Sequence, residues 1–280
     1  MPDLLITSAS GLEAVVAREL QSLGYESQIL QSGRQLIQAE PRDIAVTNLH
    51  LRVAERVLVR VGCYRATDFE ALFDQAVALP WEQWIPIDGR FPVRGRSIKS
   101  QLASVPALQR AINRAVAQRL MSAHSVSTLP ETGPLYSIEV ALLKNEVTLT
   151  IDTTGVGLHK RGYRPAAGKA PLRETLAAAL VLLSRWTPDR PLIDPFCGLG
   201  TIPIEAAMLG RAIAPGYQRQ FAAEEWPLFK TSGIWETVRA EAAAQVIPEL
   251  PQRILGSDID GSRRRRNLAL GPKRSRACHR

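Results

Sequence analysis

Hydrophobic positions in the first 54 residues alternate between the spacing of strands and the spacing of helices. Leu4–Thr7 is a short apolar run typical of a strand, and residues 28–39 fit two more short strands. Ser10-Gly-Leu-Glu13 has the spacing of a capping box and predicts the start of a helix. Pro41 can start a second helix. The order β-α-β-β-α predicts a small α+β unit over residues 1–54.

The same two spacings continue through residues 55–154. Charged and apolar residues alternate over Arg56–Val61, which predicts a strand, and Thr67-Asp-Phe-Glu70 predicts a capped helix after it. A longer helix with an apolar stripe is expected over residues 104–121, and residues 135–150 fit a hairpin of two strands. These elements predict a second α+β unit, which we place at residues 55–154.

A stretch rich in Gly, Pro and cations, residues 153–170, predicts the junction to the rest of the chain. The pattern from Pro171 to Trp186 then predicts a strong helix, with Pro and Glu174 in its first turn. We expect three leucines on the inner face of this helix: Leu176, Leu180 and Leu183.

A strand, a glycine turn and a helix start follow one another around Asp194. The apolar strand ends on that carboxylate, Gly198 and Gly200 provide a tight turn, and an Ala-rich helix begins. A second strand, over residues 254–260, also ends on carboxylates. Two such strands joined through a helix are the first half of a Rossmann-like sheet. The predicted fold class is therefore α/β, with an N-terminal α+β region followed by an incomplete Rossmann-like domain over residues 165–280.

The glycine turn has the chemistry of a cofactor site. Backbone N–H groups at a helix start attract polar ligands, and a carboxylate at the strand end can bind hydroxyls or oppose a cation. The motif favours a partly cationic, nucleotide-like cofactor. A purely structural turn remains the alternative, because Gly-Leu-Gly is not the Gly-x-Gly-x-x-Gly of dinucleotide binders.

The net charge of +8 comes from one end of the sequence. Residues 261–280 contain eight Arg or Lys and no Asp or Glu, so residues 1–260 have a net charge of zero. Two acid-free basic windows, residues 89–130 and 155–173, can place cations against phosphates. The alternative is a pair of solvated faces.

Several site classes are not supported by the sequence. The longest apolar run is far shorter than the ~20 residues that span a bilayer. Cys63, Cys197 and Cys278 form no CxxC pair, and the four His show no ligand spacing. We expect a soluble cytoplasmic protein without a metal or a membrane partner, with Cys197 packed beneath the glycine turn rather than acting as a nucleophile.

The stretch Asp194-Pro-Phe-Cys-Gly-Leu-Gly-Thr-Ile-Pro-Ile-Glu-Ala-Ala207 resembles the S-adenosylmethionine motif of THUMP-domain class I RNA methyltransferases. The bacterial 23S rRNA guanine-N2 type is the most similar subgroup. The resemblance covers roughly residues 4–260. Several ordered segments carry it besides the motif: residues 56–60, 92–100, 158–164, 170–177 and 210–216, with Trp81, Phe221 and Trp226.

The resemblance implies a cofactor, a partner and site residues. S-adenosylmethionine would be held by Asp194, Pro195, Phe196, Cys197, Gly198, Gly200, Thr201, Asp258 and Asp260. The 23S ribosomal RNA would contact Arg94, Lys99 and Ser100 in the THUMP region. Arg161 and Arg164, also assigned to RNA binding, would lie near the cofactor or the entering base. Arg110 and Arg114, four apart on one helix face, are added from the charge pattern. Leu199 departs from the small residue expected in the turn.

One catalytic feature of the family is missing. The family binds the target amine with an Asn-Pro-Pro-Tyr-like loop, and this sequence contains no Pro-Pro dipeptide. We therefore assign no catalytic residue and expect a C-terminally truncated methyltransferase, inactive unless another polypeptide supplies the loop. The basic tail, residues 261–280, fits out-of-frame sequence, with an RNA-binding arm or a disordered end as alternatives.

Three functions follow in order of preference. The first is transfer of a methyl group from S-adenosylmethionine to guanine N2 of 23S rRNA, as the activity of the family. The second is a non-catalytic RNA-binding THUMP protein that uses the two basic windows. The third is a different Rossmann-type cofactor enzyme.

Overall fold

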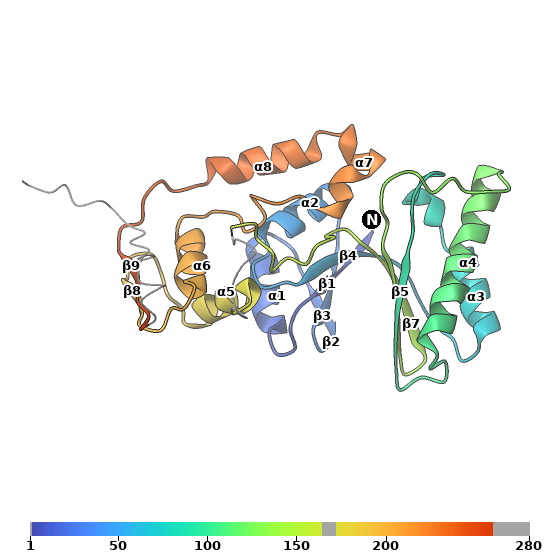
Figure 1. The fold of residues 1–280 in the computed structure, drawn as a ribbon, viewed down its shortest axis with the longest axis horizontal. Helices are drawn as coiled ribbons and strands as arrows, with labels where there is room; N and C mark the ends of the chain where they lie inside the picture. Colours follow the sequence, from blue (N-terminus) through green and yellow to red (C-terminus); the bar gives the residue numbers. More distant parts are fainter. Residues whose placement is uncertain (1, 164–171, 260–280) are drawn as a thin grey trace, which may run out of the picture.

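A seven-stranded sheet connects the two predicted α+β units (Figure 1). The computed structural model describes residues 2–163 and 172–259. The strand order is β2-β3-β1-β4-β7-β6-β5, in which only β5 and β6 pair in parallel. The strands are β1 (Asp3–Thr7), β2 (Gln28–Gln31), β3 (Arg34–Gln38), β4 (Arg56–Arg65), β5 (Val93–Ile98), β6 (Ile138–Leu143) and β7 (Glu146–Asp152).

Strand β4 is shared by both halves of this sheet. Its first residues pair with β1, and nearly its whole length pairs with β7 on the other side. The register shifts between Arg60 and Gly62, which increases the local twist. The predicted boundary at residue 54 therefore falls just before a strand that belongs to both halves, and the domain limits themselves stay predictions.

Four helices pack on one face of the sheet. They are α1 (Glu13–Ser22), α2 (Pro41–His50), α3 (Phe69–Ala78) and α4 (Val105–His124). Alternate strand residues such as Leu4, Val59 and Val140 point into the core beneath them. Leu5 and Leu58 are also buried but lie outside that core, because they point to the opposite face.

The C-terminal region has its own helices and a separate two-stranded sheet. It contains α5 (Glu174–Leu183), β8 (Leu192–Asp194), α6 (Thr201–Gly210), α7 (Pro227–Lys230), α8 (Ile234–Ala244) and β9 (Ile254–Gly256). Strands β8 and β9 pair in parallel, and a small core that includes Val181, Ala206 and Ile254 lies against them. The predicted mixed α/β fold class is confirmed.

The insertion between α6 and β9 runs back over the N-terminal half, where α8 lies beside α2 (Figure 1). Trp226 is buried there, stacks on Tyr136 at 4.7 Å between ring centroids, and donates from its indole to the carbonyl of Leu135. Trp226 is therefore a core residue, and its contacts join the C-terminal region to the predicted THUMP unit.

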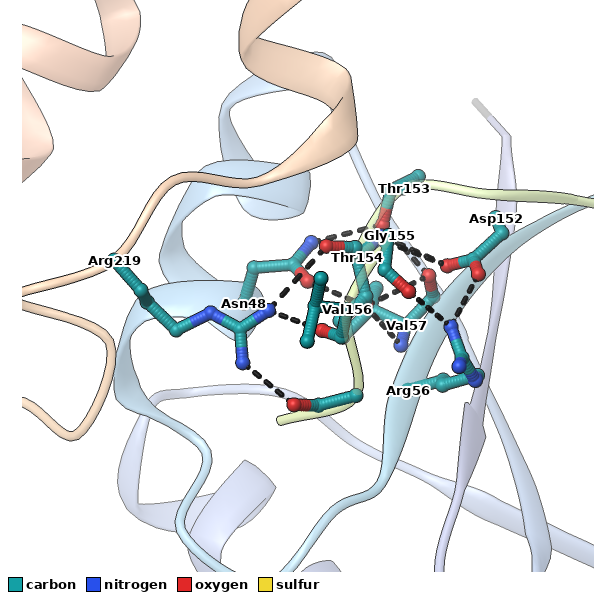
Figure 2. A network of polar contacts seen from close by, with 10 residues as sticks. Asn48, Arg56, Val57, Asp152, Thr153, Thr154, Gly155, Val156 and Arg219 are labelled. Carbon is teal, nitrogen blue, oxygen red and sulfur yellow. Dashed lines mark hydrogen bonds and ion pairs between the residues drawn. The ribbon is translucent and has the colours of Figure 1, made fainter. Parts of the chain in front are cut away.

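A polar network at the end of β7 joins three parts of the chain (Figure 2). Thr154 Oγ1 donates to Asn48 Oδ1 at 2.7 Å and accepts from the Val57 amide at 2.9 Å. Arg219, from the insertion after α6, donates to the carbonyls of Val156 and Gly157. The chain leaving the seven-stranded sheet is thus fixed to α2, to β4 and to the C-terminal region.

Three predicted local features are wrong. Helix α1 begins at Glu13 with no side-chain cap from Ser10, because the Glu13 carboxylate instead accepts from the amides of Gly11 and Gly33. The cap of α3 is Asp68, which accepts from the Ala71 amide at 2.8 Å, rather than Thr67.

The leucines of α5 are the third feature. Leu176, Leu180 and Leu183 are 36%, 49% and 50% exposed. Small residues, among them Ala177 and Ala178, are buried instead and allow α5 to lie close against α6. The inner face of α5 is therefore the alanine face.

Candidate functional site

The turn after β8 has the backbone conformation that its glycines require. Gly198 and Gly200 have φ values of 52° and 79°, in the left-handed region that favours glycine. Oδ1 of Asp194 accepts from the Phe196 amide at 3.1 Å, and the Gly200 amide donates to the Cys197 carbonyl at 2.7 Å. Gly200 is also the N-cap of α6, so the turn leads directly into a helix N-terminus.

The second parallel strand closes this turn. The Ser257 amide donates to the Asp194 carbonyl and the Cys197 amide to the Ser257 carbonyl, both at 2.9 Å. Oδ2 of Asp258 accepts from the Gly198 amide at 2.9 Å. The structure therefore brings Asp194, Gly198 and Asp258 together, although Asp194 and Asp258 lie far apart in the sequence.

The remaining predicted cofactor residues divide by exposure. Pro195 and Phe196 are exposed, the latter by 87%, whereas Thr201 is buried at the start of α6. A Cβ atom placed on Gly256 would lie 3.0 Å from the sulfur of Cys197, which agrees with Cys197 packing against the second strand. Asp260 lies outside the described residues.

The described residues fit a cationic nucleotide ligand. Two carboxylates stand at the carboxyl ends of β8 and β9, and Oδ2 of Asp194 accepts no hydrogen bond from any residue that the structure describes. The first N–H groups of a helix have no partner within the helix, and glycine lets a ligand approach the backbone. The turn can thus accept hydrogen bonds from hydroxyl groups and attract a positive charge.

Arg161 has a different position from the one predicted. Its side chain is 2% exposed, and its Nε lies 3.5 Å from the carboxylate of Glu205 on α6. Its other guanidinium nitrogens donate to the carbonyls of Leu158 and Arg52. In this structure the Arg161 side chain is therefore buried between the N-terminal region and helix α6 and is not available for the predicted RNA contact. Arg164 falls among the residues that are not described.

Helix α6 is held by this buried charge cluster. Tyr163 also donates to the Glu205 carboxylate, at 2.9 Å. On the other side, Glu19 of α1 accepts from the backbone amides of Arg52 and Val53, and burial raises the pKa of the Glu19 carboxyl. The cluster connects α1, the linker and α6, and it positions the helix that begins at the cofactor turn.

The predicted RNA residues lie on two sides of the sheet. Gly95 of β5 faces Val105 and Gln109 of α4, so its neighbour Arg94 points to the opposite face of the sheet. Arg110 and Arg114 are exposed on α4 itself. The structure thus separates Arg94 from the arginines of α4.

Two further predicted RNA residues follow β5. Lys99 is exposed. The hydroxyl of Ser100 donates to the carbonyl of Ile98 and accepts from the Asn145 amide, both at 3.0 Å. Ser100 therefore fixes the loop, and its hydroxyl is engaged by the backbone.

Sequence reasoning missed a set of residues whose partners are distant in the chain. They include Arg34 and Glu139, which pair across the sheet, and Glu205 and Tyr163, which hold α6. Arg96 was visible only as a member of the first basic window. Its position two residues from Arg94 is the signal that places both on one face of β5.

Among residues 2–163 and 172–259, no helix combines the length and the apolarity needed to cross a bilayer. In the same ranges, no group of three or more His, Cys, Asp or Glu is arranged to hold a metal ion.

Comparison with known families assigns each part of the chain. An RlmL ferredoxin-like domain matches residues 3–58, a THUMP domain matches residues 66–152, and an RMKL-like methyltransferase domain matches residues 161–266. The chain is 45% identical over 259 residues to "Putative RNA methyltransferase YpsC" of Bacillus subtilis, covering 92% of this chain and 67% of YpsC.

Solved structures have the same fold. One, described as a predicted N6-adenine-specific DNA methylase from Listeria monocytogenes, has a TM-score of 0.90 and 49% identity over 93% of this chain and 68% of its own. A second, SMU.472, described as a putative methyltransferase complexed with SAH, has a TM-score of 0.88 and 43% identity over 93% and 69%. The chain spans about two thirds of the length of these relatives. The chain belongs to the family of THUMP-containing, RlmL-like RNA methyltransferases.

Proposed function

We propose that the turn from Asp194 to Thr201 binds S-adenosylmethionine. The observation that carries the proposal is the hydrogen bond from the Gly198 amide to Asp258, which closes the turn on the second strand. Closure gathers two carboxylates and a helix N-terminus at the carboxyl ends of two parallel strands, where sheets of this kind bind nucleotides. The solved complex of SMU.472 with SAH supports this ligand class.

The turn's own residues would hold and orient this cofactor. When bound, S-adenosylmethionine supplies an electrophilic methyl group on a positively charged sulfur. Asp194 and Asp258 would place negative charge beside it and accept hydrogen bonds from its hydroxyl groups. Gly198 and Gly200 would let it approach the backbone closely. The exposed ring of Phe196 offers an apolar face.

The methyl acceptor that we propose for the family activity is guanine N2 of 23S rRNA. The match of residues 66–152 to a THUMP domain and the similarity to YpsC favour RNA. The description of the Listeria relative suggests a rival acceptor, N6 of adenine in DNA. Both are exocyclic amines, so the same displacement applies: the nitrogen attacks the methyl carbon, the carbon–sulfur bond breaks, and the nitrogen then loses a proton.

The residues of this sequence do not provide the amine-binding loop, so we propose that it cannot complete the transfer alone. Within the described residues β8 pairs only with β9, and Ile193 at its centre is 68% exposed. A cavity of about 520 Å³ lies beside that strand, lined in part by Leu180, Trp186 and Ile202. Parallel sheets are normally covered on both faces. These features fit a domain that is completed by further strands.

Methyl transfer from labelled S-adenosylmethionine to 23S rRNA tests this function. We expect no transfer by the chain alone, and transfer at guanine N2 when the part of YpsC that the chain does not match is added. Transfer by residues 1–280 alone would contradict the proposed dependence on a second polypeptide. Transfer to adenine N6 of DNA, with none to rRNA, would replace the proposed acceptor.

The second candidate function is RNA binding without catalysis. It is favoured by exposed cations on both sides of the sheet, Arg94, Lys99, Arg110 and Arg114, whose positions do not depend on the cofactor turn. Binding should weaken with salt and should survive deletion of residues 261–280. Loss of all affinity with the tail would show that the body has only solvated basic faces.

A further inference from the structure

The seven-stranded sheet is bent across its helix-free face. Arg34 of β3 and Glu139 of β6 form an ion pair at 2.6 Å, although β1, β4 and β7 lie between their strands. Four strand spacings in a flat sheet amount to roughly 19 Å, further than these two side chains can bridge. The face that carries Arg34 and Glu139 is therefore concave.

A trough of about 340 Å³ lies on this concave face. The turn between β2 and β3 forms one wall, and strands β5, β6 and β7 form the other and the floor. Helices α1 to α4 pack on the opposite face, so no described helix covers the trough. Its lining consists of Gln31, Ser32, Arg34, Arg96, Ile98, Ala141, Leu142, Leu143 and Thr148.

The trough has a surplus of positive charge. Arg34 and Arg96 share the carboxylate of Glu139, at 2.6 Å and 3.4 Å, so two guanidinium groups meet one anion. The Arg34 side chain is only 7% exposed and lies in a medium where an additional anion interacts strongly. Arg94 is exposed on the same face of β5 and extends the positive strip beyond the trough.

The floor of the trough is apolar. Ile98 is 48% exposed, and Ala141 and Leu143 lie beside it on the neighbouring strand. Apolar side chains and guanidinium planes are the surfaces on which unstacked bases are held in single-strand binding sites. A phosphate group alone would use the arginines and leave this floor exposed.

We infer that the trough binds one or two nucleotides of single-stranded RNA, with phosphate against Arg34 and Arg96 and a base against Ile98. The inference rests on the proposed RNA substrate and identifies where the RNA strand would lie. The volume is at the low end of the ~300–1,000 Å³ typical of small-ligand sites, a size that suits one or two nucleotides. The strand then follows the concave face, and the arginines of α4 lie outside its path.

Fluorescence anisotropy with a short single-stranded RNA and a hairpin of equal charge tests this placement. Arg96→Gln removes one cation from the trough, and Arg18→Gln on α1 removes one exposed cation on the helix-covered side of the sheet, outside both basic windows. We expect Arg96→Gln to weaken single-strand binding about tenfold and to reduce the slope of log K against log salt by about 0.7, as for one lost phosphate contact. Arg18→Gln should change neither value appreciably.

Ile98→Asp provides a second measurement, because it adds an anion to the floor of the trough at a half-exposed position outside the main core. It should abolish single-strand binding while the thermal unfolding midpoint stays close to that of the parent chain. Equal binding by the parent, Arg96→Gln and Ile98→Asp would overturn the inference, as would tighter binding of the hairpin. If the parent chain binds no RNA of either form, the proposed RNA function itself fails.

Discussion

The guanidinium of Arg161 lies 3.5 Å from the carboxylate of Glu205, and both side chains are almost completely buried. This pair joins the linker to the helix that starts at the cofactor turn. A buried ion pair contributes little net stability, but removal of one partner leaves an uncompensated buried charge. The relationship therefore makes Arg161 a positioning residue for α6.

Substitution of Arg161 tests that role. Arg161→Met should destabilise the chain by about 3–5 kcal/mol, measured by urea unfolding. Arg42 and Glu241 form a comparable pair whose side chains are 47% and 50% exposed. Arg42→Met should cost only about 0–1 kcal/mol. Equal losses in the two variants would show that burial of the Arg161–Glu205 pair has no energetic consequence.

The glycines of the cofactor turn give a second prediction. Gly198→Ala places a Cβ on a residue with φ of 52°, at a cost of roughly 1–3 kcal/mol, and moves the turn away from the conformation that holds Asp258. We expect it to lose S-adenosylmethionine binding in equilibrium dialysis.

Gly233→Ala is the matched control for this substitution. Gly233 is also left-handed, with φ of 65°, caps α8, and has open space around its Cβ position. It should show a similar loss of stability with the cofactor affinity unchanged. If Gly233→Ala abolishes cofactor binding too, the effect comes from general unfolding and the assignment to the turn fails.

The network at the end of β7 gives a third prediction. Thr154→Val keeps the shape of the side chain but leaves the Val57 amide and Asn48 Oδ1 without this partner. A buried unsatisfied group costs about 1–3 kcal/mol, so the unfolding midpoint should fall accordingly. Thr231→Val, at an exposed hydroxyl on α7's end, should change stability by less than about 0.5 kcal/mol. Equal stabilities for the two variants would contradict a structural role of the network.

Stability should also depend on pH through His50. Burial, and then the nearby cation Arg52, lower the pKa of this histidine below its ordinary value. A base whose pKa is lower in the folded state is protonated more readily when unfolded, so stability falls as pH drops through about 6.5. Unfolding of the parent chain at pH 7.5 and 5.5 should show this loss, and His50→Gln should reduce it. An identical pH dependence in the variant would exclude His50 as its source.

Local patterns predicted most elements of the fold because their causes are local. The hairpin turn at Lys144 and Asn145, the strand before Asp194 and the helix at residues 104–121 each depend on spacing within a few residues. The prediction of a capping box at Ser10 was wrong because the Glu13 carboxylate accepts a hydrogen bond from the amide of Gly33, in a turn later in the chain.

The features that sequence could not supply depend on pairs distant in the chain. In the sequence, Arg161 lies in a basic window and resembles an RNA-binding arginine. Its burial follows from its pairing with Glu205, which is distant in the chain. The leucines of α5 have the spacing of one helix face, which predicted that this face is buried. The alanine face is buried instead, because small side chains let α5 pack closely against α6. The bend of the sheet is seen in the pair of Arg34 and Glu139, whose strands are separated by β1, β4 and β7.

Calorimetric titration of S-adenosylmethionine into the full chain, the parent beside Asp258→Asn, tests the cofactor assignment most directly. The parent should bind S-adenosylmethionine and not NAD. Asp258→Asn removes the charge that holds the Gly198 amide and should weaken binding at least tenfold, about 1.4 kcal/mol. Absence of S-adenosylmethionine binding by the parent, preference for NAD, or unchanged affinity in Asp258→Asn would contradict the assignment of this turn.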